Sequence, residues 1–534
     1  MAERARGGRL HYLGIAARVP AVDDPGLQAL WPLDVPGFHR IVLDDGRVVL
    51  DLMVGTLDAV LPQIDARVDA FFVGGAAPAS LAHGLAKLAV QGATLHAQAP
   101  DEAFVWALTA AGFVCKAVDG GTDVSAVYRS RKPQPAAPSQ PDRRAIVIGA
   151  GLAGSAAAHR LCANGWQVTL IERHAQPAQE ASGNLAGIFM PLLSKDDNIP
   201  TRLSRAAYLF ALREWRRLGG VGAAFDGASC GVLQLARDGA HAKVQQEVVA
   251  AWDYPQEYVR WLDAAAAGAR IGAATPHGGW LFERGGWARP ASLCEAMLAA
   301  CGERLRRVFA TEAMVLQRVD GAWQVRGDDG ALIAQAPTVV LASGASAVRI
   351  AQAAELPLSA LRGQVTHLTA DEGAPRLPLV VCREAYVTPP VNGIVCAGAT
   401  YDNDDDPALR PASQLENLTR LAEIIPGDAV AALASTAPLA GRVGFRCAAP
   451  DRLPLAGALP DYRSAGRLER LRDVPRHPGL HCLLGYASRG LIWAPLMAEL
   501  LVSQLEHTPP PLEAALVEAL DPGRFLLKQR RRSQ

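Results

Sequence analysis

Apolar runs and helical spacings of apolar residues divide the chain at one proline-rich stretch. Upstream of that stretch, short apolar runs predict strands at residues 47–54, 67–75 and 92–99. Helical spacing predicts helices near residues 80–90 and 101–111, and two more short strands follow. The pattern predicts a small α/β unit over residues 1–130, in which the first two strands are buried.

The dividing stretch is RKPQPAAPSQPD, residues 131–142. Its four prolines lack the backbone N–H that a helix or a sheet ladder needs, so we expect an extended linker. Residues 143–534 follow as one large unit. A chain of 534 residues is too long for one ordinary core, which also predicts more than one domain.

The large unit opens on a nucleotide-binding pattern. An apolar strand is followed by G-x-G-x-x-G, by a helix to about Ala163, and by a second strand, QVTLI, that ends in an acidic residue. The residues of the pattern are Gly149, Gly151, Gly154 and Glu172. This order of elements is typical of a Rossmann-type dinucleotide site.

Each residue of the pattern has a physical task. Gly149 permits the tight turn, Gly151 lets the backbone approach a pyrophosphate, and Gly154 allows close packing of helix and strand. The positive end of the helix faces the phosphates, and Glu172 is expected to accept the ribose hydroxyls. The motif alone fits FAD and NAD equally well.

Later segments favour FAD. ASGNLAG supplies a loop of small residues, and VVLASGASA predicts a strand that ends in a glycine turn. LLGYASRGLIWAP places a second glycine turn before an apolar helix, whose N-terminal N–H groups suit the negative charge of a reduced flavin at its N1–C2 carbonyl edge. The cofactor-binding candidates in these segments are Ser182, Gly183, Asn184, Gly187, Gly344, Gly485, Ser488, Arg489, Gly490 and Leu491.

Composition narrows the class of protein. Half of the residues are hydrophobic, and 53 basic residues balance 53 acidic ones, so a nucleic-acid partner would have to bind a local patch. The nine cysteines stand singly, which argues against a structural metal and a disulfide framework. No apolar run reaches the ~18 residues of a membrane span, and no signal peptide is recognisable. We expect a cytoplasmic protein without metal or membrane contact.

Several segments together resemble a known family. The glycine motif, ASGNLAG, LRGQV, GFRCAAPDRLPLAG and SRGLIWAP are similar to the glycine-oxidase branch of the D-amino-acid oxidase fold. GGWARP, AGATYDNDD and the closing EALDPGRFLLKQRRR resemble the oxidoreductase half of the bifunctional tRNA 5-methylaminomethyl-2-thiouridine biosynthesis family. The resemblance implies an α/β fold: a Rossmann-type FAD-binding domain with an interleaved antiparallel-sheet substrate domain, preceded by a partial Rossmann-like methyltransferase unit.

The resemblance also implies a reaction. FAD-dependent oxidation would remove the carboxymethyl group of carboxymethylaminomethyl-(2-thio)uridine at the tRNA wobble position, giving aminomethyl-uridine and glyoxylate. In the glycine-oxidase pattern, an arginine at the place of Arg446 grips the substrate carboxylate through two parallel N–H···O bonds. Further candidates for the wall of the substrate pocket are Arg362, Gln364, Tyr401 and Tyr486.

The N-terminal unit resembles the methyltransferase half of that family only in its later part, PGFHRIVLDDGRVVLDLMVG and RVDAFFVGGAAPA. The family's first strand and glycine-rich loop, where S-adenosylmethionine sits, have no counterpart. Its Asp-Gly-Phe-Ala-Pro and Asn-Pro stretches are replaced by residues 74–78 and by Leu81 and Ala82. We therefore expect neither methyl-donor binding nor methyl transfer.

A tRNA substrate needs phosphate contacts, and two basic sets are candidates. One is Arg202, Arg205, Arg213 and Arg216 along a predicted helix, and the other is Lys528, Arg530, Arg531 and Arg532 in the tail. The alternative for the helix is an ordinary solvated face. Two other functions stay open: a free amino-acid oxidase of the glycine or sarcosine type, and a tRNA-docking or scaffold role for the N-terminal unit.

Overall fold

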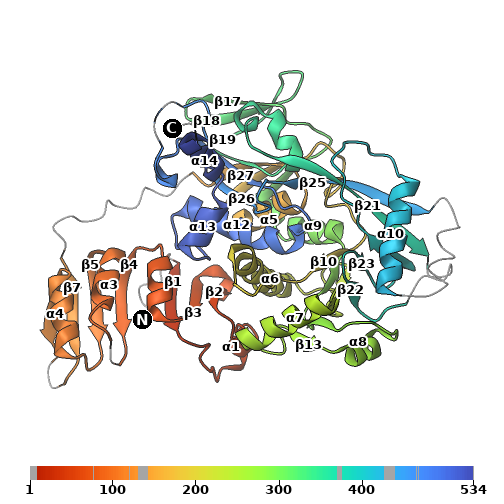
Figure 1. The fold of residues 1–534 in the computed structure, drawn as a ribbon. Coiled ribbons are helices and arrows are strands. Elements are labelled where there is room, and N and C mark those ends of the chain that lie inside the picture. Colours follow the sequence, from red (N-terminus) through yellow and green to blue (C-terminus); the bar gives the residue numbers. More distant parts are fainter. Residues whose placement is uncertain are drawn as a thin grey trace.

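The computed structural model describes residues 9–75, 77–118, 121–129, 142–369, 376–425, 439–464, 466 and 468–532. Figure 1 shows the N-terminal unit at one end of the molecule and the remaining residues gathered around two large sheets. The expected linker at residues 131–142 lies outside the described residues except for Asp142.

The N-terminal unit contains two separate small sheets. The first has the strand order β1-β3-β2, with bounds β1 Leu10–Ala16, β2 Gly37–Leu43 and β3 Val48–Val54. The second has the order β4-β5-β7-β6, with bounds β4 Val68–Val73, β5 Ala89–Ala97, β6 Phe113–Ala117 and β7 Val124–Tyr128. Two short helices, α1 (Pro25–Gln28) and α2 (Leu57–Val60), accompany the first sheet. The strands expected at 47–54, 67–75 and 92–99 are confirmed.

The second sheet is covered by helices on one face. Helices α3 (Leu81–Leu88) and α4 (Glu102–Ala110) pack on the side of Phe71, and α4 begins where the Asp101 carboxylate accepts the Phe104 N–H at 2.7 Å. The expectation that residues 67–75 form a fully buried strand is wrong, because successive side chains of a strand point to opposite faces. Phe72 therefore faces away from the helices and is 61% exposed.

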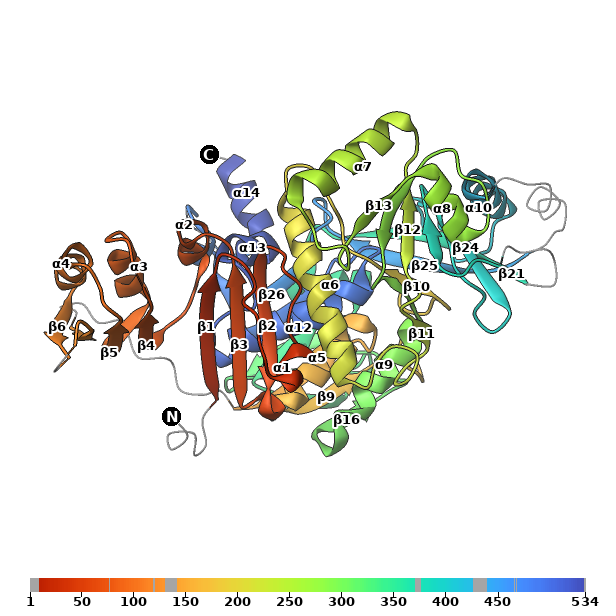
Figure 2. The same ribbon diagram turned by 90° about the horizontal axis from the view of Figure 1, so that it is seen from below.

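The first sheet packs against the large unit. Figure 2 shows β2 beside α6 (Ile199–Arg217), with α12 (Gly490–Glu506) behind them. Arg40 of β2 donates to both oxygens of Asp51, at 2.8 and 2.6 Å, and to Glu499 of α12 at 3.0 Å. Residues 37–54 therefore share a buried polar contact with the C-terminal half of the chain.

This contact extends to the helix of the glycine motif. The second oxygen of Glu499 accepts a hydrogen bond of 2.8 Å from the Arg160 Nε of α5 (Leu152–Ala163). Burial alone would raise the pKa of Glu499. The guanidinium groups of Arg160 and Arg40 lower it by more than burial raises it, and the resulting pKa is about 2. We call Arg40, Asp51, Arg160 and Glu499 the buried charge cluster.

The first large sheet has six strands in the order β16-β9-β8-β20-β27-β26. Its bounds are β8 Arg144–Ile148, β9 Gln167–Ile171, β16 Leu305–Val308, β20 Thr338–Leu341, β26 Leu455–Pro460 and β27 Arg476–Leu484. All neighbours run parallel except β26 and β27. The central strands read as continuous apolar runs because both faces of a parallel sheet are buried. Helix α5 packs against α12 and α9 (Pro290–Ala299).

The second large sheet has eight strands in the order β13-β14-β12-β22-β23-β24-β21-β25. Its bounds are β12 Val232–Leu235, β13 Arg260–Leu262, β14 Gly279–Phe282, β21 Ser359–Thr369, β22 Val380–Cys382, β23 Tyr386–Val387, β24 Ile394–Gly398 and β25 Ala440–Ala448. All neighbours run antiparallel except β12 and β22. Along the chain its strands alternate in blocks with those of the parallel sheet, which confirms the expected interleaved fold.

Smaller elements complete the large unit. The remaining strands form two three-stranded sheets: β10 Gly187–Phe189, β15 Gly286–Ala288 and β11 Gly227–Ala228, and β17 Val315–Val319, β18 Ala322–Arg326 and β19 Leu332–Ala336. The remaining helices are α7 Gly239–Trp252, α8 Ala264–Ile271, α10 Pro411–Ile424, α13 Ala514–Leu520 and α14 Arg524–Arg532. Among the residues that the structure describes, no helix has both the length and the apolar character needed to cross a membrane.

Candidate functional site

One cavity of about 490 Å³ is lined by residues from both large sheets. At one end it meets the carboxyl ends of β8, β9, β20 and β27, which is where ligands bind in open α/β sheets. At the other end it meets β21, β24 and β25 of the antiparallel sheet. The cavity is therefore long enough to bring a dinucleotide site and a second binding surface together.

The glycine motif shapes the first end of the cavity. Gly149 has φ +102°, and a Cβ there would lie 2.7 Å from the Ala342 carbonyl oxygen. Gly154 lies behind the wall, where a Cβ would lie 1.7 Å from the Gly149 oxygen. Gly151 lines the cavity, so any side chain at Gly151 would extend into it. These are the contacts expected of a turn that a pyrophosphate approaches closely.

Glu172 lies at the end of β9 and lines the same end of the cavity. Its two oxygens accept the backbone N–H groups of Ala150 at 2.7 Å and His174 at 3.0 Å. These bonds fix the carboxylate in one orientation, while each oxygen keeps a further lone pair for a ribose hydroxyl. Ser182 accepts the Leu152 N–H at 3.1 Å, which ties the small-residue loop to the first turn of α5.

The N-terminus of α12 forms another part of the wall. Predicted cofactor residues that line the cavity here and nearby are Ser182, Asn184, Gly187, Gly344, Gly485, Ser488, Arg489, Gly490 and Leu491. Gly183 does not line the cavity: a Cβ on it would lie 2.1 Å from the Arg442 guanidinium, so this glycine makes room for an arginine on the outside of the loop. Gly183 is thus set back from the cavity wall, and its contact with the cofactor stays a prediction.

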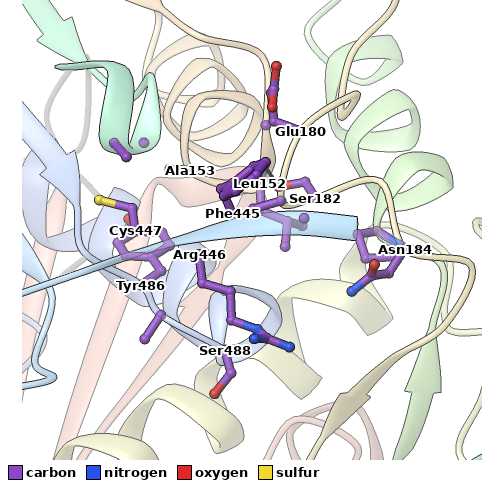
Figure 3. Close-up of a pocket in the computed structure, with 18 of the residues that line it drawn as sticks. Leu152, Ala153, Glu180, Ser182, Asn184, Phe445, Arg446, Cys447, Tyr486 and Ser488 are labelled. Carbon is purple, nitrogen blue, oxygen red and sulfur yellow. Dashed lines mark hydrogen bonds between the residues drawn. The ribbon is translucent and has the colours of Figure 1, made fainter. Parts of the chain in front are cut away.

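Arg446 extends from β25 into the cavity, as Figure 3 shows. Its Nη1 donates to the Thr400 carbonyl oxygen at 3.1 Å, and its guanidinium lies 4.4 Å from the ring centroid of Tyr401. No carboxylate of the described residues forms an ion pair with Arg446. A guanidinium held on one side by a carbonyl and a ring keeps its other donors for an anionic ligand.

Arg362 and Gln364 do not line the cavity, which corrects our prediction. Both are fully buried, and Arg362 donates to Asp402, to the Asp406 and Ala408 carbonyl oxygens and to Gln364. Strand alternation explains the error, because neighbours in β21 point to opposite faces. The cavity residue is Gly363, where a Cβ would lie 2.0 Å from Arg446 Nη1.

Tyr401 and Tyr486 both line the cavity, as expected. Tyr486 is buried, and burial raises the pKa of its hydroxyl. Arg489 also faces the cavity, and burial lowers the pKa of its guanidinium because no described carboxylate pairs with it.

Sequence reasoning missed part of the wall. The missed residues include Arg173, Thr311, Met314, Arg349, Cys382, Arg383, Tyr386, Ala399 and Phe445. Arg173 was within reach, since it directly follows the acidic end of β9. Ala399 and Phe445 lie in AGATYDNDD and GFRCAAPDRLPLAG, two segments quoted for the family resemblance, but neither residue was chosen there; the remaining ones come from loops and strands without a local motif. No group of three His, Cys, Asp or Glu side chains in the described chain is placed to hold a metal ion.

The four arginines of α6, one of the two candidate sets for phosphate contacts, bond to other parts of the chain instead. Arg205 pairs with Asp197 at 2.6 Å, and Arg202 pairs with Glu513 at 3.2 Å. The other two hold the N-terminal unit: Arg213 donates to the Arg40 carbonyl oxygen at 3.1 Å, and Arg216 donates to that of Ala29. Burial lowers the pKa of Arg213 to about 10.

The basic tail is helical in α14. Arg530 donates to the Ser464 carbonyl oxygen at 3.0 Å, and Arg531 donates to that of Glu469. Lys528 is exposed, and the side chain of Arg532 lies outside the described residues. Two basic residues of the tail, Arg530 and Arg531, therefore already bond to carbonyl oxygens of the same chain.

Two family models match the chain. A model described as FAD dependent oxidoreductase matches residues 144–504, and one described as S-adenosyl-L-methionine-dependent methyltransferase matches residues 25–120. The first covers the two large sheets and the cavity. The second covers most of the N-terminal unit.

Curated relatives match nearly the whole chain. The tRNA 5-methylaminomethyl-2-thiouridine biosynthesis bifunctional protein MnmC of Paraburkholderia xenovorans is 41% identical over 99% of this chain and 87% of its own length. The protein of the same name from Azoarcus sp. is 45% identical over 95% of this chain and 81% of its own length.

Solved structures share the fold of the large unit. Glycine oxidase from Geobacillus kaustophilus is 21% identical, has a TM-score of 0.58, and aligns over 72% of this chain and 99% of its own. Iminodiacetate oxidase from Chelativorans sp. is 26% identical, has a TM-score of 0.55, and aligns over 71% of this chain and 99% of its own.

Proposed function

The chain belongs to the family of bifunctional tRNA 5-methylaminomethyl-2-thiouridine biosynthesis proteins, MnmC, and we propose that its large unit removes the carboxymethyl group from carboxymethylaminomethyl-uridine at the tRNA wobble position. The products are aminomethyl-uridine and glyoxylate. FAD, when bound, would supply the two-electron oxidation of the bond between the α-carbon of the carboxymethyl group and the amine nitrogen. Water then hydrolyses the imine, which releases the base-linked amine and glyoxylate.

The residues present fit FAD. The glycine motif and Glu172 suit the pyrophosphate and the ribose, and the first turn of α12 points N–H groups and positive dipole into the same cavity. This chain supplies orientation and electrostatics more than acid–base chemistry, because a neutral amine needs no protein base to lose a hydride.

The observation that carries the proposal is the unpaired guanidinium of Arg446 in the same cavity as the glycine motif. We propose that Arg446 holds the substrate carboxylate, so that the α-carbon faces the flavin. A free amino-acid oxidase would use the same arginine. The tRNA substrate is favoured because identity of 41–45% over nearly the whole chain is to MnmC proteins, whereas the glycine oxidases are 18–21% identical.

The proposal is tested by mass spectrometry of wobble uridines from a strain that lacks the gene. We expect carboxymethylaminomethyl-uridine to accumulate and to disappear when the gene is restored. The proposal would be wrong if the wobble uridines were unchanged and glycine rapidly reduced the purified flavoprotein under anaerobic conditions. The chain would then be a free amino-acid oxidase.

Gly151→Val should abolish the yellow colour of the purified protein. The valine side chain would extend into the cavity where the pyrophosphate is expected. Its Cβ would lie 3.1 Å from Ser182 Oγ, so within the protein only this hydroxyl has to shift, by a few tenths of an ångström. Absorbance at flavin wavelengths, measured against protein concentration, checks this. Gly74→Val serves as the control, since Gly74 lies outside the cavity, has no positive φ and would have nothing within 4 Å of an added Cβ. A fully flavinated Gly151→Val protein would contradict the assignment.

We propose that the N-terminal unit transfers no methyl group, although a methyltransferase model matches it. The support is the loss of the family's glycine-rich loop and of its polar residues at positions 74–78. Calorimetry with S-adenosylmethionine should therefore give no saturable heat. A micromolar isotherm, or conversion of aminomethyl-uridine to its methylated form, would overturn this proposal.

The unit is better suited to a scaffold role, because β2 of its first sheet packs on α6 and its Arg40 bonds to Glu499 and Ser503 of α12. We also propose the division at residues 1–130, 131–142 and 143–534 as the order of units along the sequence, and the cytoplasm as the place where the protein works.

A further inference from the structure

Tyr401 is an aromatic side chain on the cavity wall that is largely open to solvent. It is 56% exposed, whereas Tyr486 on the same wall is 8% exposed. The ring lies 4.4 Å from the Arg446 guanidinium, so it stands next to the expected carboxylate position. An exposed ring at this place has an apolar face with no partner in the described chain.

The backbone on both sides of Tyr401 is held firmly. Arg362 and Asp402 form a two-way backbone pair with both N–H···O distances at 3.0 Å, and the Thr400 N–H donates to the Gln364 oxygen at 3.2 Å. The buried Arg362 side chain adds bonds to Asp402 and to the carbonyl oxygens of Asp406 and Ala408. Arg362 thus anchors the corner that presents the ring.

We propose that Tyr401 is the platform on which the wobble uracil stacks while Arg446 holds the carboxylate. The inference rests on the proposed function and names the residue that selects a nucleobase-linked substrate. Four single bonds of about 1.5 Å join the carboxyl carbon to the uracil ring, so the base lies within about 5 Å of the carboxylate. The guanidinium and the ring centroid are 4.4 Å apart, so the two proposed contacts are neighbours on the cavity wall, as a linker of this length requires.

A rigid, exposed ring suits a base because its position costs little to fix on binding. Stacking of one base on an aromatic side chain is worth roughly 5- to 150-fold in affinity by alanine substitution. The ring also covers one face of the Arg446 guanidinium, which leaves the donors of its edge to the carboxylate. Carboxylate and base would then be held by neighbouring side chains of one corner.

The test compares two ligands that share the carboxymethylamine group and differ in the base. The first is the nucleoside carboxymethylaminomethyl-uridine, followed by anaerobic flavin reduction, and the second is iminodiacetate, followed by its inhibition constant against the nucleoside. In Tyr401→Leu we expect the half-saturating nucleoside concentration to rise about tenfold or more, the limiting rate to change little, and the iminodiacetate constant to stay within about twofold. Tyr401→Phe and Tyr401→Trp should retain nucleoside affinity.

The control is Tyr12→Leu, because Tyr12 is similarly exposed, at 53%, but lies on β1 outside the cavity. Equal weakening of both ligands in Tyr401→Leu would show that the ring acts only through Arg446, and unchanged nucleoside affinity would also overturn the proposal. A wild-type flavin that neither the nucleoside nor the tRNA reduces would instead remove the proposed function, and with it this inference.

Discussion

Arg446→Ala should leave the protein fully flavinated and slow the reduction of its flavin by tRNA carrying carboxymethylaminomethyl-uridine at least tenfold. A charged hydrogen bond to a carboxylate contributes about 1.5–3 kcal/mol, and 1.36 kcal/mol corresponds to a factor of ten in rate. Flavin content should not change, because Arg446 belongs to the antiparallel sheet and lies outside the glycine motif. Stopped-flow absorbance under anaerobic conditions measures the rate.

Arg446→Lys should remain slow although it keeps the charge. Lysine presents a point charge and cannot hold a carboxylate in a plane, so the α-carbon would no longer be fixed against the flavin. The matched control is Arg318→Ala: Arg318 also lies over an aromatic ring, that of Trp323 at 6.0 Å, but outside the cavity. Reduction by tRNA that survives unchanged in Arg446→Ala would remove this residue from the mechanism.

Glu499→Gln should lower the free energy of unfolding by about 3–5 kcal/mol, although Glu499 does not line the cavity. The substitution leaves Arg40 and Arg160 buried with one carboxylate fewer, and the desolvation of each cation is then less well compensated. Urea unfolding followed by flavin fluorescence measures the change at constant FAD concentration.

The control for Glu499 is Glu247→Gln, which removes the exposed pair with Lys195 and should cost about 0–1 kcal/mol.

The effect of Glu499→Gln on the free energy of unfolding should also depend on pH. Because the pKa of Glu499 is lowered to about 2, its stabilising contribution is present above the ordinary glutamate pKa and is lost as the pH falls toward 2. Wild-type and Glu499→Gln proteins should therefore differ most near neutral pH. Equal stability at pH 7 would contradict the role of the buried charge cluster.

Local motifs made the dinucleotide end of the site predictable. The glycine turn, α5 and Glu172 lie within 24 residues, so their relative positions follow from one strand–helix–strand unit. Arg446 was predictable only through a family resemblance, since nothing local separates it from other strand arginines. In LRGQV the polar side chains were chosen and the glycine was overlooked. The face of β21 that meets the cavity depends on its pairing with β25, which the segment alone does not reveal.

The arginines of α6 show a second limit. Their spacing correctly places several of them along one helix, but spacing says nothing about what covers that helix. The partners of Arg213 and Arg216 are backbone oxygens 173 and 187 residues away in the sequence. A solvated charged helix face and a charged face that bonds to a distant segment have the same sequence pattern. Only the tertiary structure distinguishes the two.

The buried charge cluster has a consequence for synthesis on the ribosome. Arg40 and Glu499 are 459 residues apart in the sequence. At a translation rate of 5–20 residues per second, Glu499 is therefore synthesised roughly 20–90 s after Arg40. Asp51 lies directly opposite Arg40 in the β2–β3 hairpin and pairs with it at 2.6 Å. The hairpin therefore leaves the ribosome carrying its own counter-ion. A nascent chain without Asp51 would hold an unpaired cation on a surface destined for burial until α12 has been made.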